Sequence, residues 1–197
     1  MSEYWWDPAP LAEVVAVFAG FPGRWWIAGG YAMELAAGRA YREHGDIDVL
    51  LLRRDQLAAH RVLPGWDLWA ADPPGTLRPW PAGEVLPRHV HDIWCRERSD
   101  GPWRVQLMLD EADGTDWVSR RDPAVRRPIA DLGRTDAAGV PYLRPEIQLY
   151  YKARARRPKD EQDFATVAPL LDAPARGWLA TRLPAGHPWR TELEAVA

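Results

Sequence analysis

Runs of apolar residues place the most regular part of the chain between residues 25 and 53. Residues 25–28 form a short apolar run that is typical of a strand, and a second apolar run follows over 46–53. Successive side chains of a strand point to opposite faces. In the second run, apolar side chains therefore occupy both faces: Ile47, Val49 and Leu51 on one, Leu50 and Leu52 on the other. This pattern predicts a strand that is buried on both sides.

Helical spacing and turn residues predict the other elements. Helices are expected over 7–19, with Asp7 as its cap, over 31–37 and over 55–62. Strands are expected at 66–70, as a sheet edge, and at 89–96 and 104–110, joined by a hairpin, with short extended pieces at 117–121 and 126–129. Residues 71–88 are rich in Pro and Gly and predict a long loop. From residue 145 onward the spacing is helical, with a third helix over 176–183.

Composition and charge exclude several classes of protein. The 197 residues are 47% hydrophobic, which suits one domain or one domain with a helical appendage. A net charge of −3 gives no basic surface for nucleic acid. Without a signal segment or a long apolar run, the protein is expected to be cytoplasmic, with no membrane partner. Cys95, the only cysteine, is expected in the core, and the twelve Trp reflect composition more than an aromatic cleft.

Two carboxylates interrupt the second apolar run. Asp46 and Asp48 lie on the face of Leu50, where unpaired charges are costly to bury and repel each other. Their spacing lets both converge on one divalent cation, and Mg²⁺ is usually held by one or two carboxylates together with substrate phosphates. Gly29 and Gly30 precede a predicted helix, where bare backbone and N–H groups can approach a phosphate. The segment therefore predicts a metal site beside a phosphate cradle.

These residues resemble a known signature. The motif of the nucleotidyltransferase superfamily is similar to Gly29-Gly30, Arg42, His44 and Asp46-Ile47-Asp48 of this chain. The sequence over 24–56 resembles the aminoglycoside 2″-adenylyltransferase-like branch of that superfamily. Each short motif alone is weak, whereas their order and spacing are more specific. The resemblance implies an α+β fold, with a nucleotidyltransferase-type mixed β-sheet flanked by helices. It also implies a catalytic domain over 1–144 and a helical C-terminal subdomain over 145–197.

The resemblance also implies roles for particular residues. A third acidic residue belongs on a later strand, where Asp110 resembles it and Asp92 is the alternative. Asp46, Asp48 and Asp110 would hold Mg²⁺, and Asp110 could accept the proton of an attacking hydroxyl. The nucleotide-binding residues would be Gly29, Gly30, Arg42, His44 and Lys152. Arg42 could instead pair with Glu43, and His44 could brace a carboxylate or a loop. Lys152 belongs to a "K…R.KD..D" pattern that otherwise reads as a solvated helix junction.

The implied activity is Mg²⁺-dependent transfer of a nucleoside monophosphate, AMP from ATP, to a hydroxyl of an aminoglycoside-like small molecule. Antibiotic resistance would be the outcome. The partners are then a nucleoside triphosphate and a small hydroxylated substrate, which a mildly acidic chain can accept as a cation, and the protein would be a monomer or a homodimer. Two alternatives remain open: a nucleotidyltransferase acting on a protein partner, as in toxin–antitoxin pairs, and a catalytically silent nucleotide-binding protein.

Overall fold

Two parallel strands form the centre of the fold in a computed structural model that describes residues 5–195. Strand β2 (Asp48–Leu52) pairs with β6 (Val105–Asp113), and the register runs from Asp48 opposite Gln106 to Leu52 opposite Asp110. The outer edges of this pair are covered by antiparallel strands, β1 (Trp25–Ile27) beside β2 and β5 (Asp92–Arg96) beside β6. The start of β2, where the predicted acid pair lies, is thus in the middle of a wide sheet.

The sheet is mixed, as predicted. Its strands follow the order β4-β3-β5-β6-β2-β1-β10-β9. Two neighbouring pairs in this order are parallel, β2 with β6 and β1 with β10, and the other neighbouring pairs are antiparallel. Strands β7 and β8 extend the far end of β6 as a hairpin. The bounds of these six outer strands are β3 Asp67–Ala71, β4 Leu77–Pro79, β7 Asp116–Val118, β8 Arg126–Pro128, β9 Gly133–Thr135 and β10 Pro141–Leu143.

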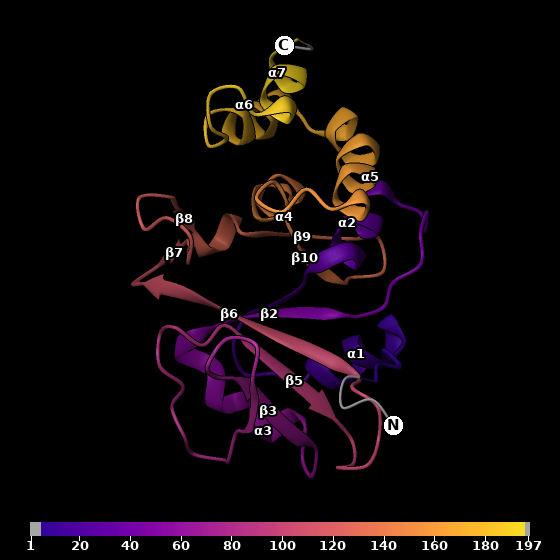
Figure 1. The fold of residues 1–197 in the computed structure, drawn as a ribbon, viewed down its shortest axis with the longest axis vertical. Coiled ribbons are helices and arrows are strands. Elements are labelled where there is room, and N and C mark those ends of the chain that lie inside the picture. Colours follow the sequence, from indigo (N-terminus) through magenta and orange to yellow (C-terminus); the bar gives the residue numbers. More distant parts are fainter. Residues whose placement is uncertain (1–4, 196–197) are drawn as a thin grey trace.

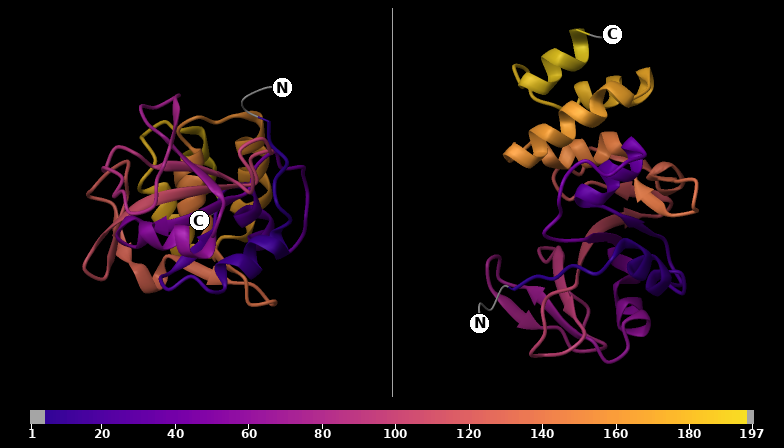
Figure 2. Two further views of the ribbon diagram at one scale, coloured as in Figure 1. Left: turned by 90° about the horizontal axis from the view of Figure 1, so that it is seen from below. Right: turned by 90° about the vertical axis from the view of Figure 1, so that its right-hand side faces the viewer.

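Helices surround the sheet and continue beyond it. The α-helices are α1 Leu11–Phe18, α2 Gly29–Ala37, α3 Ala59–Val62, α4 Pro145–Lys152, α5 Pro158–Val167, α6 Ala173–Ala180 and α7 Pro188–Ala195. Short 3₁₀ helices are η1 Arg53–Ala58, η2 Ile129–Asp131 and η3 Ala168–Leu170. Helices α4 to α7 gather at one end of the molecule, opposite β3, β5 and α3 (Figures 1 and 2). Within residues 5–195, no helix is long and apolar enough to cross a membrane.

Strand β2 is buried on both faces, which confirms the prediction from its sequence. Val49 and Leu51 belong to one apolar cluster, together with residues of α1 and α2. Leu50 and Leu52 belong to a second cluster on the opposite face. All four side chains are at most 1% exposed. Because burying a Val or Leu side chain contributes about 1.5–3 kcal/mol, these residues anchor the strand that positions Asp48.

The α+β architecture is confirmed, whereas some element boundaries differ. Helix α1 begins at Leu11, because Pro10 is its cap and Asp7 instead pairs with Arg104. Strand β3 is not an edge strand, since β4 pairs with its outer side from within the segment expected to be a loop. Helix α7 was not predicted. Helix α4 follows β10 directly and contacts α2, so the division at residue 144 stays a prediction.

Two further side chains, Cys95 and Trp80, belong to the packing. Cys95 is fully buried in β5, as predicted, and burial raises the pKa of its thiol well above the usual value. Trp80 is 2% exposed, and its indole N–H donates to the carbonyl oxygen of Glu84 at 2.8 Å. Trp80 therefore packs beneath the loop.

Candidate active site

A cavity of about 340 Å³ lies beside the starts of β2 and α2, between the sheet and the junction of α4 with α5. It joins residues that are far apart in the sequence: Gly29, Gly30, Arg42, Asp46, Asp48, Gln106, Met108, Arg120, Arg121, Gln148, Tyr151, Lys152, Ala155, Arg157, Lys159 and Asp160. Of these described residues, six are basic and three are acidic. The cavity therefore combines the predicted acid pair with a basic wall.

Asp48 stands at the first position of β2, against the backbone of Gly29. A Cβ atom at position 29 would collide with the Oδ2 atom of Asp48, and the φ of +63° at Gly29 is a left-handed value that favours glycine. Burial, followed by repulsion from Asp46, raises the pKa of Asp48 to about 7. The acid pair thus has the unfavourable charge that a divalent cation would offset.

The two glycines are the first residues of helix α2, which starts two residues earlier than predicted, and both line the cavity. The N–H of Gly29 donates to Oε1 of Gln148, at 2.9 Å. A Cβ atom at Gly30 would collide with the guanidinium of Arg42 and the ring of His44. Both positions therefore need glycine so that charged side chains can approach the start of the helix. A role of this turn in binding phosphate stays a prediction.

Arg42 and Lys152 line the cavity and are held from behind by buried acids of α5. The Nε and Nη2 atoms of Arg42 donate to Asp163, at 2.8 and 3.0 Å. The Lys152 Nζ atom lies 2.8 Å from an oxygen of Asp163 and 3.2 Å from one of Asp160. Asp160 and Asp163 are fully buried. The acid partner of Arg42 is therefore Asp163 rather than Glu43, the alternative considered from the sequence.

His44 is not among the described residues that line the cavity. Its ring stacks on that of Tyr31 with centroids 4.2 Å apart, and its Nε2 atom lies 3.1 Å from Glu34. Burial lowers the pKa of His44, so the ring is neutral at pH 7. His44 therefore braces Glu34, which was one of its predicted roles, and a contact with phosphate stays a prediction.

Asp110 is separated from the acid pair, contrary to the prediction. It is opposite Leu52, four residues beyond the level of Asp48, and four residues of a strand span about 13 Å. Its carboxylate is fully buried and accepts hydrogen bonds from the indole of Trp117, at 2.7 Å, and the hydroxyl of Tyr151, at 2.8 Å. Arg120 lies 3.3 Å away. Asp110 is thus a structural acid beneath the cavity wall rather than a partner of Asp46 and Asp48.

Several cavity residues were not predicted as site residues. Lys159 is half-buried and forms no ion pair with the residues that the structure describes. Arg157 pairs with Asp160 at 2.9 Å, with 56% of its side chain exposed. Arg121 lies over the ring of Tyr151, 4.9 Å from its centroid. The "K…R.KD..D" pattern contained the signal for Lys159 and Arg157, whereas Arg121 had no comparable motif.

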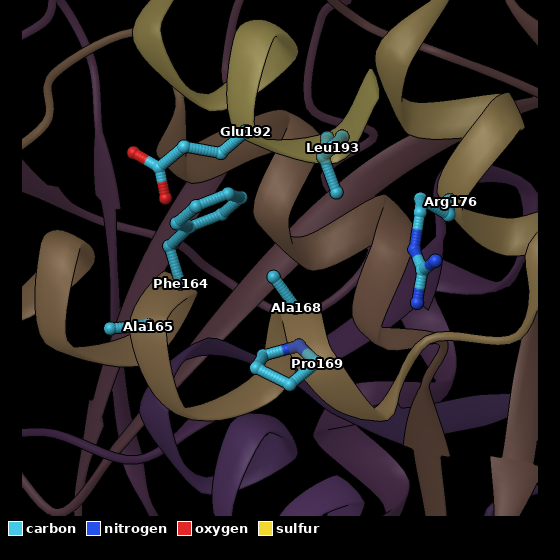
Figure 3. A pocket seen from close by; sticks show the side chains of 7 residues that line it. All are labelled: Phe164, Ala165, Ala168, Pro169, Arg176, Glu192 and Leu193. Atoms are coloured by element: carbon cyan, nitrogen blue, oxygen red, sulfur yellow. The ribbon is translucent and has the colours of Figure 1, made fainter. Parts of the chain in front are cut away.

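A second cavity, of about 140 Å³, lies among the C-terminal helices (Figure 3). Phe164 and Leu193 form much of its apolar wall, and Glu192 and Arg176 point from opposite sides (Figure 3). The acid pair and the glycine turn do not line it. The larger cavity is therefore the candidate active site.

Comparison with known proteins supports this choice. Residues 10–64 match the family model described as aminoglycoside-2″-adenylyltransferase. The matched segment contains α1, β1, α2 and β2, and with them Gly29, Gly30, Asp46 and Asp48. None of the curated protein sequences compared with the chain matches it.

Solved structures share the fold over most of the chain. The lincosamide antibiotic adenylyltransferase LnuA, bound to lincomycin, is 14% identical with a TM-score of 0.55, covering 84% of this chain and 100% of its own. ANT(2″)-Ia in complex with adenylyl-2″-tobramycin is 13% identical with a TM-score of 0.54, covering 94% and 95%. An antigenic nucleotidyltransferase-like protein from Paracoccidioides brasiliensis is 18% identical with a TM-score of 0.51, covering 96% and 94%. The family-model match over residues 10–64 and the shared fold together confirm the resemblance predicted from the sequence: the chain has the fold of these nucleotidyltransferases and is similar to the aminoglycoside 2″-adenylyltransferase branch.

Proposed function

We propose that the chain transfers AMP from ATP, with Mg²⁺, to a hydroxyl group of a small antibiotic-like molecule. The observation that carries this proposal is the cavity, in which Asp46 and Asp48 face a wall of basic side chains. A triphosphate is a polyanion, so it is attracted by the basic wall, and its metal ion by the carboxylates. The similarity to lincosamide and aminoglycoside adenylyltransferases supports an antibiotic as the acceptor.

The residues of the cavity fit a divalent cation. Asp46 and Asp48 would hold it, because burial and then repulsion from Asp46 already raise the pKa of Asp48 to about 7. When bound, Mg²⁺ would neutralise charge on the phosphate oxygens during the transfer. Arg42 and Lys152 line the same cavity, and ion pairs with Asp163 hold both side chains in place.

The proposed reaction is an in-line displacement at the α-phosphorus. A bond forms between the acceptor hydroxyl oxygen and the α-phosphorus, the bond to the bridging oxygen of the β-phosphate breaks, and pyrophosphate and the hydroxyl proton leave. The protein contributes position and charge rather than covalent chemistry. Lys159 and Arg157 are suited to the β- and γ-phosphates because their side chains border the cavity and are less buried than Lys152.

The test is incubation of the full chain with each labelled nucleoside triphosphate, Mg²⁺, and a panel of lincosamides, aminoglycosides and other hydroxylated antibiotics. We expect pyrophosphate release that requires both acceptor and metal, together with a product whose mass increases by one AMP. AMP found on a co-purified protein would favour the protein-modifying alternative. If Mg²⁺-ATP neither reacts nor shifts the melting temperature, the chain is silent and the proposal is wrong.

Lys159→Gln is expected to raise the KM for ATP by about tenfold, because a charge-assisted contact with phosphate contributes about 1.5–3 kcal/mol. Lys159 is suited to this contact because none of the acids in the described part of the chain pairs with it. Steady-state kinetics with varied ATP would measure the change, and Lys159→Arg should restore most of it. Arg61→Gln, an exposed change on α3, is the control and should leave the KM unchanged. An unaltered KM in the Lys159 variant would remove it from the phosphate site.

A further inference from the structure

Gln106 is the residue of β6 that lies beside Asp48. The two are paired in the parallel register, so their side chains project from the same face of neighbouring strands about 4.8 Å apart. Both line the cavity. The position that the sheet places next to the acid pair is therefore occupied by an amide instead of a third carboxylate.

Asp92 fixes the orientation of this amide. The Nε2 atom of Gln106 donates to Oδ1 of Asp92 at 3.0 Å. A carboxylate only accepts hydrogen bonds, so the NH₂ group of the amide must face Asp92. The carbonyl oxygen, Oε1, is on the other branch of the amide and is left for the cavity that Gln106 lines.

The surrounding acids do not supply a third ligand. In the part of the chain that the structure describes, no three His, Cys, Asp or Glu side chains are grouped so that they could hold a metal ion. Amide carbonyl oxygens are accepted ligands of hard divalent cations. Two carboxylates and one neutral amide would balance the charge of such a cation, whereas a third carboxylate would add further repulsion to the pair.

We infer that Oε1 of Gln106 is the third protein oxygen of a divalent-cation site formed with Asp46 and Asp48, and that Asp92 is a positioning residue that holds the amide in this orientation. The inference rests on the proposed function, because that function brings the metal to the acid pair. Asp92 was the alternative to Asp110 as the third acidic residue predicted from the sequence. In this inference Asp92 does not bind the metal itself but orients the amide of Gln106, which does.

The inference can be tested without nucleotide or acceptor, by measuring Mn²⁺ binding to the full chain with electron paramagnetic resonance of free Mn²⁺. We expect Gln106→Ala and Asp92→Asn to weaken the Mn²⁺ Kd by about 10-fold, as changes around metal ligands do. Gln162→Ala, an exposed glutamine of α5, is the control. Thermal unfolding of each variant shows that the fold is retained.

A double-mutant cycle separates positioning from general structure. The two oxygens of a carboxylate are equivalent, so Gln106→Glu has no amide orientation to fix, and adding Asp92→Asn to it should no longer weaken Mn²⁺ binding. Wild-type Mn²⁺ affinity in Gln106→Ala would overturn the inference while leaving the proposed function intact. Equal weakening by Asp92→Asn in both backgrounds would overturn the positioning role. If the wild type itself does not bind Mn²⁺, the metal-dependent function fails as well.

Discussion

The Asp48→Asn variant is expected to lose nucleotidyl transfer by about a hundredfold or more, in the range found when a preorganised electrostatic group is removed from an active site. Asn keeps the shape of the side chain, while the negative charge that would attract the metal ion disappears. The same change should stabilise the metal-free protein, because Asp48 is held beside Asp46 at the start of a buried strand. Pyrophosphate release and thermal unfolding in EDTA would measure the two effects.

The pH dependence of this stabilisation has a defined sign. The pKa of Asp48 is about 7 in the folded protein, above the usual aspartate value of 3.8, so the folded state binds the proton more tightly. The stability linked to this carboxyl is complete below about pH 4 and is lost as the pH rises through 7. The Asn variant avoids this loss of stability. Its free energy of unfolding should therefore exceed that of the wild type by on the order of 1–4 kcal/mol above pH 7, and the difference should vanish near pH 4.

Asp100→Asn is a suitable control for the Asp48 variant. Asp100 is exposed in the turn between β5 and β6 and pairs with the exposed side chain of Arg98. Such pairs contribute little to stability, so activity and melting temperature should stay near the wild-type values. Wild-type turnover in Asp48→Asn would show that Asp48 does not bind the metal. Equal melting temperatures of the variant and the wild type at pH 8 would show that the charge of Asp48 does not destabilise the fold.

The part of the site that the sequence predicts correctly depends on contacts between residues close in the chain. Gly29 opens α2 just after β1, and Asp48 begins the adjacent antiparallel strand β2, so only α2 and one loop separate the two residues in the chain. The apolar residues on both faces of β2 are a strong signal, because a strand with only one buried face would alternate. Local spacing therefore locates the glycine turn, the helix and the acid pair.

The third position of the site depends on register, which local spacing does not fix. In the sequence, Asp110 closes the predicted strand 104–110 as an acid, as Asp46 and Asp48 begin one, and this likeness made it the candidate. The pairing of β6 with β2 places Gln106, not Asp110, at the level of Asp48. These strands are separated by more than 50 residues in sequence, and a different register would have placed another residue there.

The charged helix junction could not be assigned from the sequence for a different reason. Lys152, Asp160 and Asp163 belong to a segment whose many charges are typical of a solvated surface. Burial appears only once α5 packs against α2 and α4, which brings Asp163 to Arg42, 121 residues away. Buried ion clusters of this kind resemble exposed charge runs in sequence, because composition does not reveal what covers them.

Asp163→Asn is expected to lower the free energy of unfolding by on the order of 3–5 kcal/mol, as does removal of one partner from a buried ion pair. The carboxylate of Asp163 is fully buried and accepts hydrogen bonds from Arg42 and from the hydroxyl of Tyr41, at 2.7 Å for the latter, while Lys152 lies 2.8 Å away. Asn cannot neutralise the two cations, so Arg42 would lose its carboxylate partner and Lys152 would keep only the more distant Asp160. Urea unfolding at pH 7 would measure the loss.

The pH dependence and a matched variant identify the cause of this destabilisation. Burial alone would raise the pKa of Asp163, but hydrogen bonds from Arg42 and Lys152 outweigh it and hold the pKa below its usual value. The stability from this charge is therefore present above about pH 4 and is lost at lower pH, so wild type and variant should converge in acid. Asp172→Asn changes an exposed cap of α6 that Asn can replace, and should cost less than about 0.5 kcal/mol. A loss for Asp163→Asn no larger than this would mean that the cluster does not hold α5 against the cavity.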